Sequence, residues 1–177
     1  MKELISRLQE RFEIKDVNYK KEGLTFAVIE DKYLVSLLNH LRDIENFTHL
    51  SFLTAVDRIE EQKFQLTYML HNYESKNSLG VKVYIDRLNA EMESIHHLWQ
   101  QAATYQRELH EMFGVKFPGS PRNDESFILE GWQDKPPMRR DFKTKKYSEE
   151  TYFPRPGRKT HDPETYMREK LYSEGDE

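Results

Sequence analysis

The sequence contains no cysteine. This absence excludes disulfides, thiol nucleophiles, thiolate-ligated zinc and iron–sulfur clusters held by cysteine alone. No stretch approaches the roughly 18 apolar residues of a membrane-spanning helix. The charged start MKELISRLQERFEI differs from a signal peptide, which needs an apolar segment there. We therefore expect a cytosolic protein that holds no cluster.

Proline is missing from residues 1–117, and all seven prolines follow, from Pro118 to Pro163. Proline lacks an amide donor and favours extended geometry in the preceding residue, so this part is expected to be strand-like or irregular. The sequence therefore predicts a body, residues 1–117, and an extended arm, residues 118–177. A chain of 177 residues is long enough for one domain with such an appendage.

The chain also lacks a global positive charge, with a formal net charge of -4. Generic nucleic-acid binding is therefore disfavoured. Residues 135–159 nevertheless hold nine Lys or Arg against three acidic residues, so the arm is locally basic. Basic tails are often disordered, but Trp132, Phe142 and Tyr147 are interleaved with these charges, and disordered segments are poor in aromatic rings. We expect an arm that becomes ordered against a partner.

Apolar residues at helical spacing predict helices in the body. The first runs from Leu4 to Phe12, the second follows Asp31 as its N-cap and has an apolar stripe from Leu34 to Ile44, and the third spans about 95–113.

Alternating apolar residues predict strands at 24–28, 64–70 and 81–85, the first of them after a turn at 21–23. Residues 49–57 are apolar on both faces, as in a central strand. Helices and strands in this order predict an α+β fold, a two-layer body with helices packed on a mixed β-sheet, followed by an extended C-terminal arm.

Metal-ligating residue types occur at His96, His97, His110 and Glu111. On an ideal helix, His96 and His110 would lie on the order of 20 Å apart, too far for one metal ion. The side chains of the neighbours His110 and Glu111 diverge, and the HExxH pattern is absent. A metal site is therefore disfavoured.

Catalytic carboxylates are equally weakly supported. Asp57, Glu108 and Asp141 are possible acids or bases, but nothing in the sequence indicates that they converge in a pocket. The glycines form no nucleotide-binding motif. Two remote alternatives stay open: a stand-alone enzyme using Asp57, His110 and Glu108, and a nucleic-acid adaptor binding through residues 135–159.

Arg107 and Glu111 stand at i,i+4 opposite the apolar stripe of the third predicted helix, while Glu108 flanks that stripe. The ordinary interpretation is a solvated pair that stabilises the helix by a few tenths of a kcal/mol. Alternatively, Arg107 and Glu108 lie at a joint between helix and arm or against another subunit, where desolvation strengthens their effect.

The stretch that ends at Phe142 reads SIHHLWQQAATYQRELHEMFGVKFPGSPRNDESFILEGWQDKPPMRRDF. Its order of residues resembles the 30 kDa family, the C subunits of respiratory complex I, NADH:quinone oxidoreductase. The family pattern in outline is Ser-Ile, an apolar helix with Trp and Ala, E-R-E, an acid, an aromatic and Gly, F-x-G-H-P, I-L, Trp, and P-L-R-K-D-F. Gln106, Ser120 and Met138 depart from it. The likeness covers residues 1–142.

The resemblance implies a non-catalytic structural subunit of proton-pumping complex I, beside the quinone-reducing D subunit. It implies an arm along the D, B or I subunits, with FMN, iron–sulfur clusters and quinone on other subunits and no cofactor bound here. The location would be peripheral, on the cytoplasmic side of the inner membrane. The alternative is the equivalent subunit of a NiFe hydrogenase or a ferredoxin- or F420-linked complex.

A partner interface needs rings that bury area, arginines that form bidentate ion pairs and prolines that lower the ordering cost. The expected interface residues are Arg107, Glu108, Trp132, Arg139, Arg140, Asp141 and Phe142. We expect charge reversal at Arg139 and Arg140 to impair assembly while the isolated body stays folded.

Overall fold

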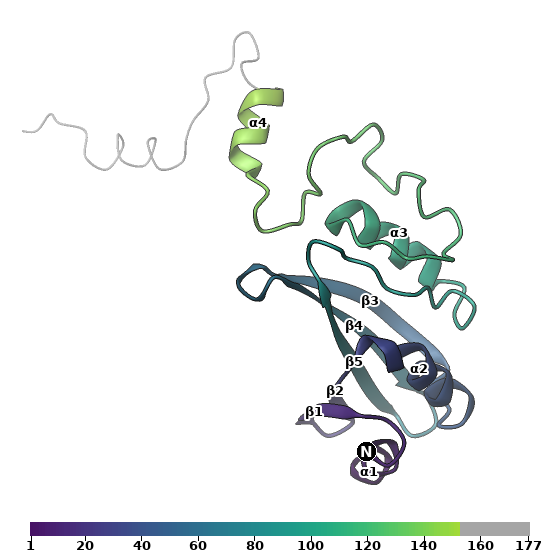
Figure 1. The fold of residues 1–177 in the computed structure, drawn as a ribbon. Helices are drawn as coiled ribbons and strands as arrows, with labels where there is room; N and C mark the ends of the chain where they lie inside the picture. Colours follow the sequence, from purple (N-terminus) through teal and green to yellow (C-terminus); the bar gives the residue numbers. More distant parts are fainter. Residues whose placement is uncertain (153–177) are drawn as a thin grey trace, which may run out of the picture. The chain divides into compact units, whose positions relative to one another are not determined.

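The computed structural model describes residues 1–152 (Figure 1). The chain divides into two compact units, Met1–Phe142 and Lys143–Glu177. In the second unit, the described part contains the helix α4 (Thr144–Tyr152). Residues 153–159 of the basic segment lie outside the described residues.

A five-stranded sheet forms the centre of the first unit, in the order β1-β2-β5-β4-β3. Its strands are β1 (Ile14–Lys21), β2 (Leu24–Ile29), β3 (His49–Arg58), β4 (Lys63–Asn72) and β5 (Asn77–Asp86). Strands β2 and β5 are parallel, and the other neighbours are antiparallel. The predicted mixed sheet is confirmed, and so is the predicted α+β fold. The spacing of apolar residues had not located β1, in which every residue is exposed or half-buried.

Three helices supply the other layer: α1 (Lys2–Gln9), α2 (Leu34–Asp43) and α3 (Ala102–Phe113). Their apolar stripes and the apolar residues on one sheet face form a single core. The predicted first residues of two helices, α2 and α3, are wrong. Residues Asp31–Tyr33 form a 3-10 turn, and the Asp31 carboxylate binds the amide of Lys32 instead of capping α2. Residues 95–101 form turns, so α3 begins at Ala102.

The prediction of a central strand at 49–57 is also wrong, because β3 is an edge strand. Leu53 and Ala55 are buried in the core, whereas Phe52 and Val56 on the other face are 41% and 47% exposed. Apolar residues on both faces therefore reflect a core on one side and an uncovered apolar surface on the other.

Side chains from the segment around α3 bind the backbone at the start of β3, and Figure 1 shows α3 beside this strand. The Trp99 indole donates to the carbonyl of Thr48 over 2.8 Å. Tyr105 donates its hydroxyl proton to the carbonyl of Ser51 over 3.1 Å. Such contacts satisfy edge groups that would otherwise pair with another strand.

Residues 118–142, which we call the proximal arm, continue from α3 as turns and irregular chain. They belong to the first unit. The amide of Met138 donates to the carbonyl of Met112 over 3.0 Å, which brings the arm back to the end of α3. Within residues 1–152, the helices are too short or too polar to cross a membrane.

Candidate functional site

A buried ion pair joins the ends of two strands. Asp57 lies near the end of β3, and Arg87 directly follows β5, with Phe64 of β4 between the two strands. Arg87 donates from Nε to Asp57 Oδ1 over 2.7 Å and from Nη2 to Oδ2 over 3.0 Å. The side chain of Arg87 is only 6% exposed, and that of Asp57 only 1%. This bidentate geometry satisfies two charges that would be costly to bury alone.

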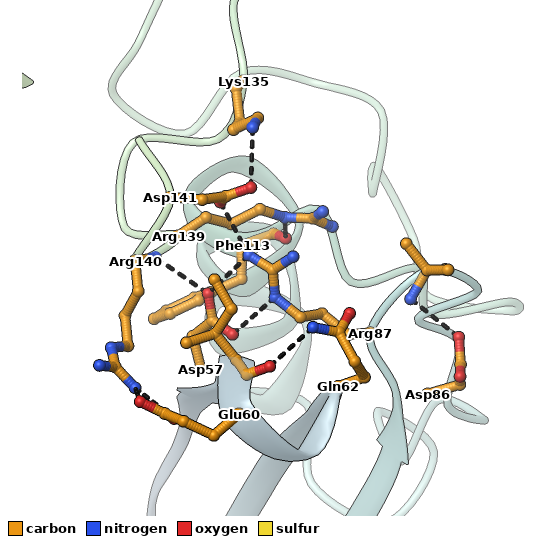
Figure 2. A network of polar contacts seen from close by, with 12 residues as sticks. Asp57, Glu60, Gln62, Asp86, Arg87, Phe113, Lys135, Arg139, Arg140 and Asp141 are labelled. Atoms are coloured by element: carbon orange, nitrogen blue, oxygen red, sulfur yellow. Dashed lines mark hydrogen bonds and ion pairs between the residues drawn. The ribbon is translucent and has the colours of Figure 1, made fainter. Parts of the chain in front are cut away.

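The proximal arm extends this pair into a network, which we call the Asp57–Arg87 cluster (Figure 2). Asp141 Oδ1 accepts from Arg87 Nη2 over 2.7 Å, and Asp141 Oδ2 accepts from Lys135 over 2.8 Å. The backbone amide of Arg140 donates to Asp57 Oδ2 over 2.9 Å. The cluster therefore fastens residues 135–141 of the arm to the sheet.

The two arginines of the arm make separate contacts with the body. Arg140 forms a bidentate pair with Glu60, with distances of 2.7 and 2.6 Å from Nη1 to the two carboxylate oxygens. Arg139 donates from Nε to the carbonyl of Phe113 over 2.6 Å, and its guanidinium lies 5.2 Å from the ring centroid of Phe64. Both arginines therefore bind residues of the body of this same chain.

Gly114 makes room for Arg139 at the end of α3. Its φ of +74° lies in the left-handed region, which favours glycine. A Cβ atom there would lie 3.0 Å from Nη2 of Arg139 and 3.2 Å from Cγ of Pro136. Any other residue would be strained and would press against the arm.

The electrostatics of the cluster keep both carboxylates ionised. Burial raises the pKa of Asp57, but hydrogen bonds from Arg87 and from the amide of Arg140 outweigh it, and the net pKa is below the usual value. The Lys135 hydrogen bond, aided by Arg87, lowers the pKa of Asp141 to about 2. Groups with such low pKa values are poor proton donors near neutral pH.

These shifts predict acid sensitivity. A carboxyl whose pKa is lowered on folding stabilises the native state above its unfolded pKa, about 4. That stabilisation is lost as the pH falls through the folded value, about 2 for Asp141. We expect the free energy of unfolding to fall between about pH 4 and pH 2. The free energy of unfolding, measured by urea titration at each pH in this range, should fall less for Asp141→Asn than for the wild type.

The matched control is Asp124→Asn, which changes an exposed carboxylate for which the described residues supply no hydrogen-bond donor. It should keep the pH dependence of the wild type. Equal pH dependence in Asp141→Asn and the wild type would contradict the assigned role of Asp141.

A second attachment of the arm is made by Glu111 on α3. Its carboxylate accepts three backbone hydrogen bonds, from Phe127 over 2.7 Å, Ile128 over 2.9 Å and Leu129 over 3.1 Å. Charged acceptors of this kind make stronger hydrogen bonds than neutral ones. Glu111 therefore fixes residues 127–129 and does not form the i,i+4 pair with Arg107 that the spacing suggests.

Replacing Glu111 by Gln should loosen residues 127–129, because an amide offers one acceptor oxygen and its NH2 group faces backbone donors. We expect a loss of about 1–3 kcal/mol for this attachment. Hydrogen exchange of those three amides should accelerate accordingly. Glu108→Gln is the control, since among the described residues no donor bonds to Glu108. Unchanged exchange in Glu111→Gln would contradict the assignment.

The remaining candidate interface residues lie on α3 and within the proximal arm. Arg107 lies 4.0 Å from Glu125 and 5.5 Å from the ring centroid of Phe127, so it does contact the arm. The rings of Trp132 and Phe142 lie 5.7 Å apart within the proximal arm. Their role at a partner interface stays a prediction.

The residues considered for an enzyme or metal site make other contacts. His110 binds the carbonyl of Val115 through Nδ1 over 3.1 Å, and Asp57 is engaged by Arg87. Within residues 1–152, no group of three or more potential ligands is placed to hold a metal ion. Arg87 itself was missed, because an arginine after a strand resembles any surface arginine in sequence.

Comparison with known proteins settles the family. The family model described as respiratory-chain NADH dehydrogenase, 30 Kd subunit, matches residues 27–148. The chain belongs to this family. The resemblance seen in the sequence is therefore confirmed. The C subunit of the NADH-quinone oxidoreductase of Moorella thermoacetica is 31% identical over 145 residues, covering 81% of this chain and 95% of that relative.

Two further members and neighbours of the 30 kDa family are informative. The C/D 2 subunit of the Aquifex aeolicus enzyme is 28% identical over 139 residues, covering 78% of this chain but 23% of that longer relative. A chain of the membrane-bound sulfane sulfur reductase, an archaeal respiratory membrane complex, superposes with a TM-score of 0.81 at 25% identity. That match covers 91% of this chain and 95% of the other.

Proposed function

We propose that this member of the 30 kDa family docks on the quinone-reducing D subunit of a proton-pumping NADH:quinone oxidoreductase and acts as a non-catalytic scaffold. The observation that carries the proposal is the double attachment of the proximal arm, through the Asp57–Arg87 cluster and through Glu111. This attachment leaves Ile128 and Met138 65% and 56% exposed on the arm. An ordered segment with exposed apolar side chains is suited to binding because little entropy remains to be lost.

The D subunit is the proposed neighbour because of the fused relatives. The Aquifex aeolicus protein carries the name C/D, so one chain combines both subunits. Two subunits that are joined in one chain by a linker can assemble only if they lie close together in the complex. We extend the proposal to the B and I subunits as further neighbours, on the support of the basic charge in residues 135–159.

We also place FMN, the iron–sulfur clusters and the quinone on other subunits. The support is compositional: iron–sulfur clusters are mostly ligated by cysteine, and this sequence contains none. The chain would contact the membrane only through the complex, on its cytoplasmic side. Its contribution is to hold redox subunits in position.

A second candidate is the equivalent subunit of a related membrane complex. The similarity to a chain of the archaeal sulfane sulfur reductase, which extends over 91% of this chain, favours it. The two candidates assign the same role but different electron donors. The partner subunits discriminate between them, because NiFe hydrogenases carry nickel-ligand cysteines and a quinone-reducing D subunit need not.

The test is purification of the full chain, affinity-tagged at its chromosomal locus, under non-denaturing conditions. Mass spectrometry should find the quinone-reducing D subunit in equimolar amount, and the particle should oxidise NADH with quinone as acceptor. A chain that elutes alone, or without redox subunits, would overturn the proposal. Redox subunits without NADH oxidation would favour the second candidate.

A further inference from the structure

The helices leave one face of the sheet uncovered. The buried side chains of β2, β5 and β3 alternate with side chains that point to the opposite side, where β3 and β5 carry exposed and half-buried residues. In the strand β4, Gln65 and Thr67 on that side are themselves buried. We call this second side the open face. Its central residues are Phe26, Phe52, Val56, Met69, Gly80 and Lys82.

An apolar row crosses the open face at right angles to the strands. In the register of the sheet Phe26 pairs with Gly80, Gly80 with Met69, and Met69 with Phe52. Gly80 has no side chain because a Cβ atom there would lie 2.4 Å from the Phe26 ring. Phe52 at one end of the row is 41% exposed, and Val56, four residues further along the same face of β3, is 47% exposed. The row gives an apolar strip that is most exposed at Phe52.

The charge beside this strip is positive. Lys82 follows Gly80 on the same face of β5, and its Nζ lies 4.6 Å from the ring centroid of Phe26. Within residues 1–152 no carboxylate lies within ion-pairing distance of Lys82. In the register its neighbours are Val28 and Thr67, and the next acidic position, Asp16, is separated from it by Val28.

Several exposed cations of the body have acidic partners. Arg7 pairs with Glu45, and Lys15 and Lys32 both pair with Glu30. An unpaired lysine beside an exposed apolar strip is complementary to a surface that combines apolar and acidic side chains.

We propose that the open face binds an acidic amphipathic helix of a neighbouring subunit. The apolar side of that helix would cover Phe52, Val56 and Met69, and one of its carboxylates would pair with Lys82. A helix is the element that commonly covers a sheet face of this kind. The inference rests on the proposed function and names a second contact, distinct from the proximal arm.

A single-stranded nucleic acid fits this face less well. Stacking of bases needs free aromatic rings. Of the rings on this face, Phe52 is 41% exposed. The Phe26 ring lies under Lys82, and the Tyr84 ring has the Arg58 guanidinium 5.9 Å from its centroid, so a strand of several bases would find one free ring. The net charge of -4 also disfavours such a ligand.

Zero-length cross-linking of the purified complex tests the proposal directly. A carbodiimide should join Lys82 to an Asp or Glu that lies on a helix of one partner subunit. Acetylation with an N-hydroxysuccinimide ester should modify Lys82 in the free full-length chain and not in the complex. Lys20 on β1, which is exposed where Lys82 is half-buried, should react in both.

Charge reversal supplies a functional test. Lys82→Glu, co-expressed with wild-type chain, should enter the complex about tenfold less often than wild type, while Lys20→Glu should compete equally. Lys82→Arg should retain incorporation but lose the cross-link. A thermal melt shows whether Lys82→Glu is folded, and the acetylation result stands independently of any variant.

The inference is overturned if Lys82 is acetylated equally in the free chain and in the complex. Binding of a fluorescent oligo(dT) to the full chain, abolished by Lys82→Glu, would also overturn it in favour of a nucleic acid. Failure of the proposed function gives a different result, because then no redox subunits copurify and no complex exists to label.

Discussion

Replacing Arg87 by Met is expected to destabilise the folded chain by about 3–5 kcal/mol, because it leaves the buried Asp57 carboxylate without its partner. The side chain of Asp57 is only 1% exposed, so water cannot replace the two lost hydrogen bonds. The same substitution releases Asp141 of the proximal arm. Equilibrium unfolding in urea would measure the loss as a lower transition midpoint.

Arg58→Met is the matched control, because Arg58 pairs with Glu61 at the surface, where both side chains are more than 40% exposed. It should cost less than about 1 kcal/mol. A double variant, Asp57→Leu with Arg87→Met, should recover much of the stability by removing both charges. If Arg87→Met is no more harmful than Arg58→Met, the cluster does not stabilise the fold.

The second large effect is expected from the double charge reversal Arg139→Glu, Arg140→Glu. A glutamate at position 140 would face Glu60, and one at position 139 would face the carbonyl of Phe113. The proximal arm should detach, and incorporation into the complex should be lost. From the sequence we expected the isolated body to stay folded, and these contacts predict in addition a lower melting temperature.

Native gel electrophoresis of the complex, with thermal melts of the free chain, would measure both effects. The control reverses two adjacent exposed charges on β1, Lys20→Glu and Lys21→Glu. It should change neither incorporation into the complex nor the melting temperature. Normal incorporation of the Arg139, Arg140 variant would show that the proximal arm is not needed for docking.

Periodic features of the fold could be predicted from the sequence. The stripes of α1 and α2 and the alternation in β4 and β5 arise from local packing, so their residues carry the pattern. Strand order does not leave such a pattern. The edge position of β3 depends on which strands pair, and its uncovered apolar face made it resemble a central strand.

The candidate site was predicted only in part, and for a related reason. Arg139, Arg140 and Asp141 were found through the family pattern, but their contacts depend on the fold. Arg87 and Asp57 are 30 positions apart and meet only because β3 and β5 both flank β4. The three amides bound by Glu111 likewise follow from the path of the arm, which no spacing rule gives.

Hydrogen–deuterium exchange of the free full-length chain and of the chain within its purified complex tests the central claim most directly. The account predicts that the amides of residues 127–129 and 138–142 are protected already in the free chain. Those of residues 130–135 should gain protection on assembly, because we propose that the quinone-reducing D subunit covers them. Free exchange of both segments in the isolated chain, or no change anywhere in the arm on assembly, would contradict it.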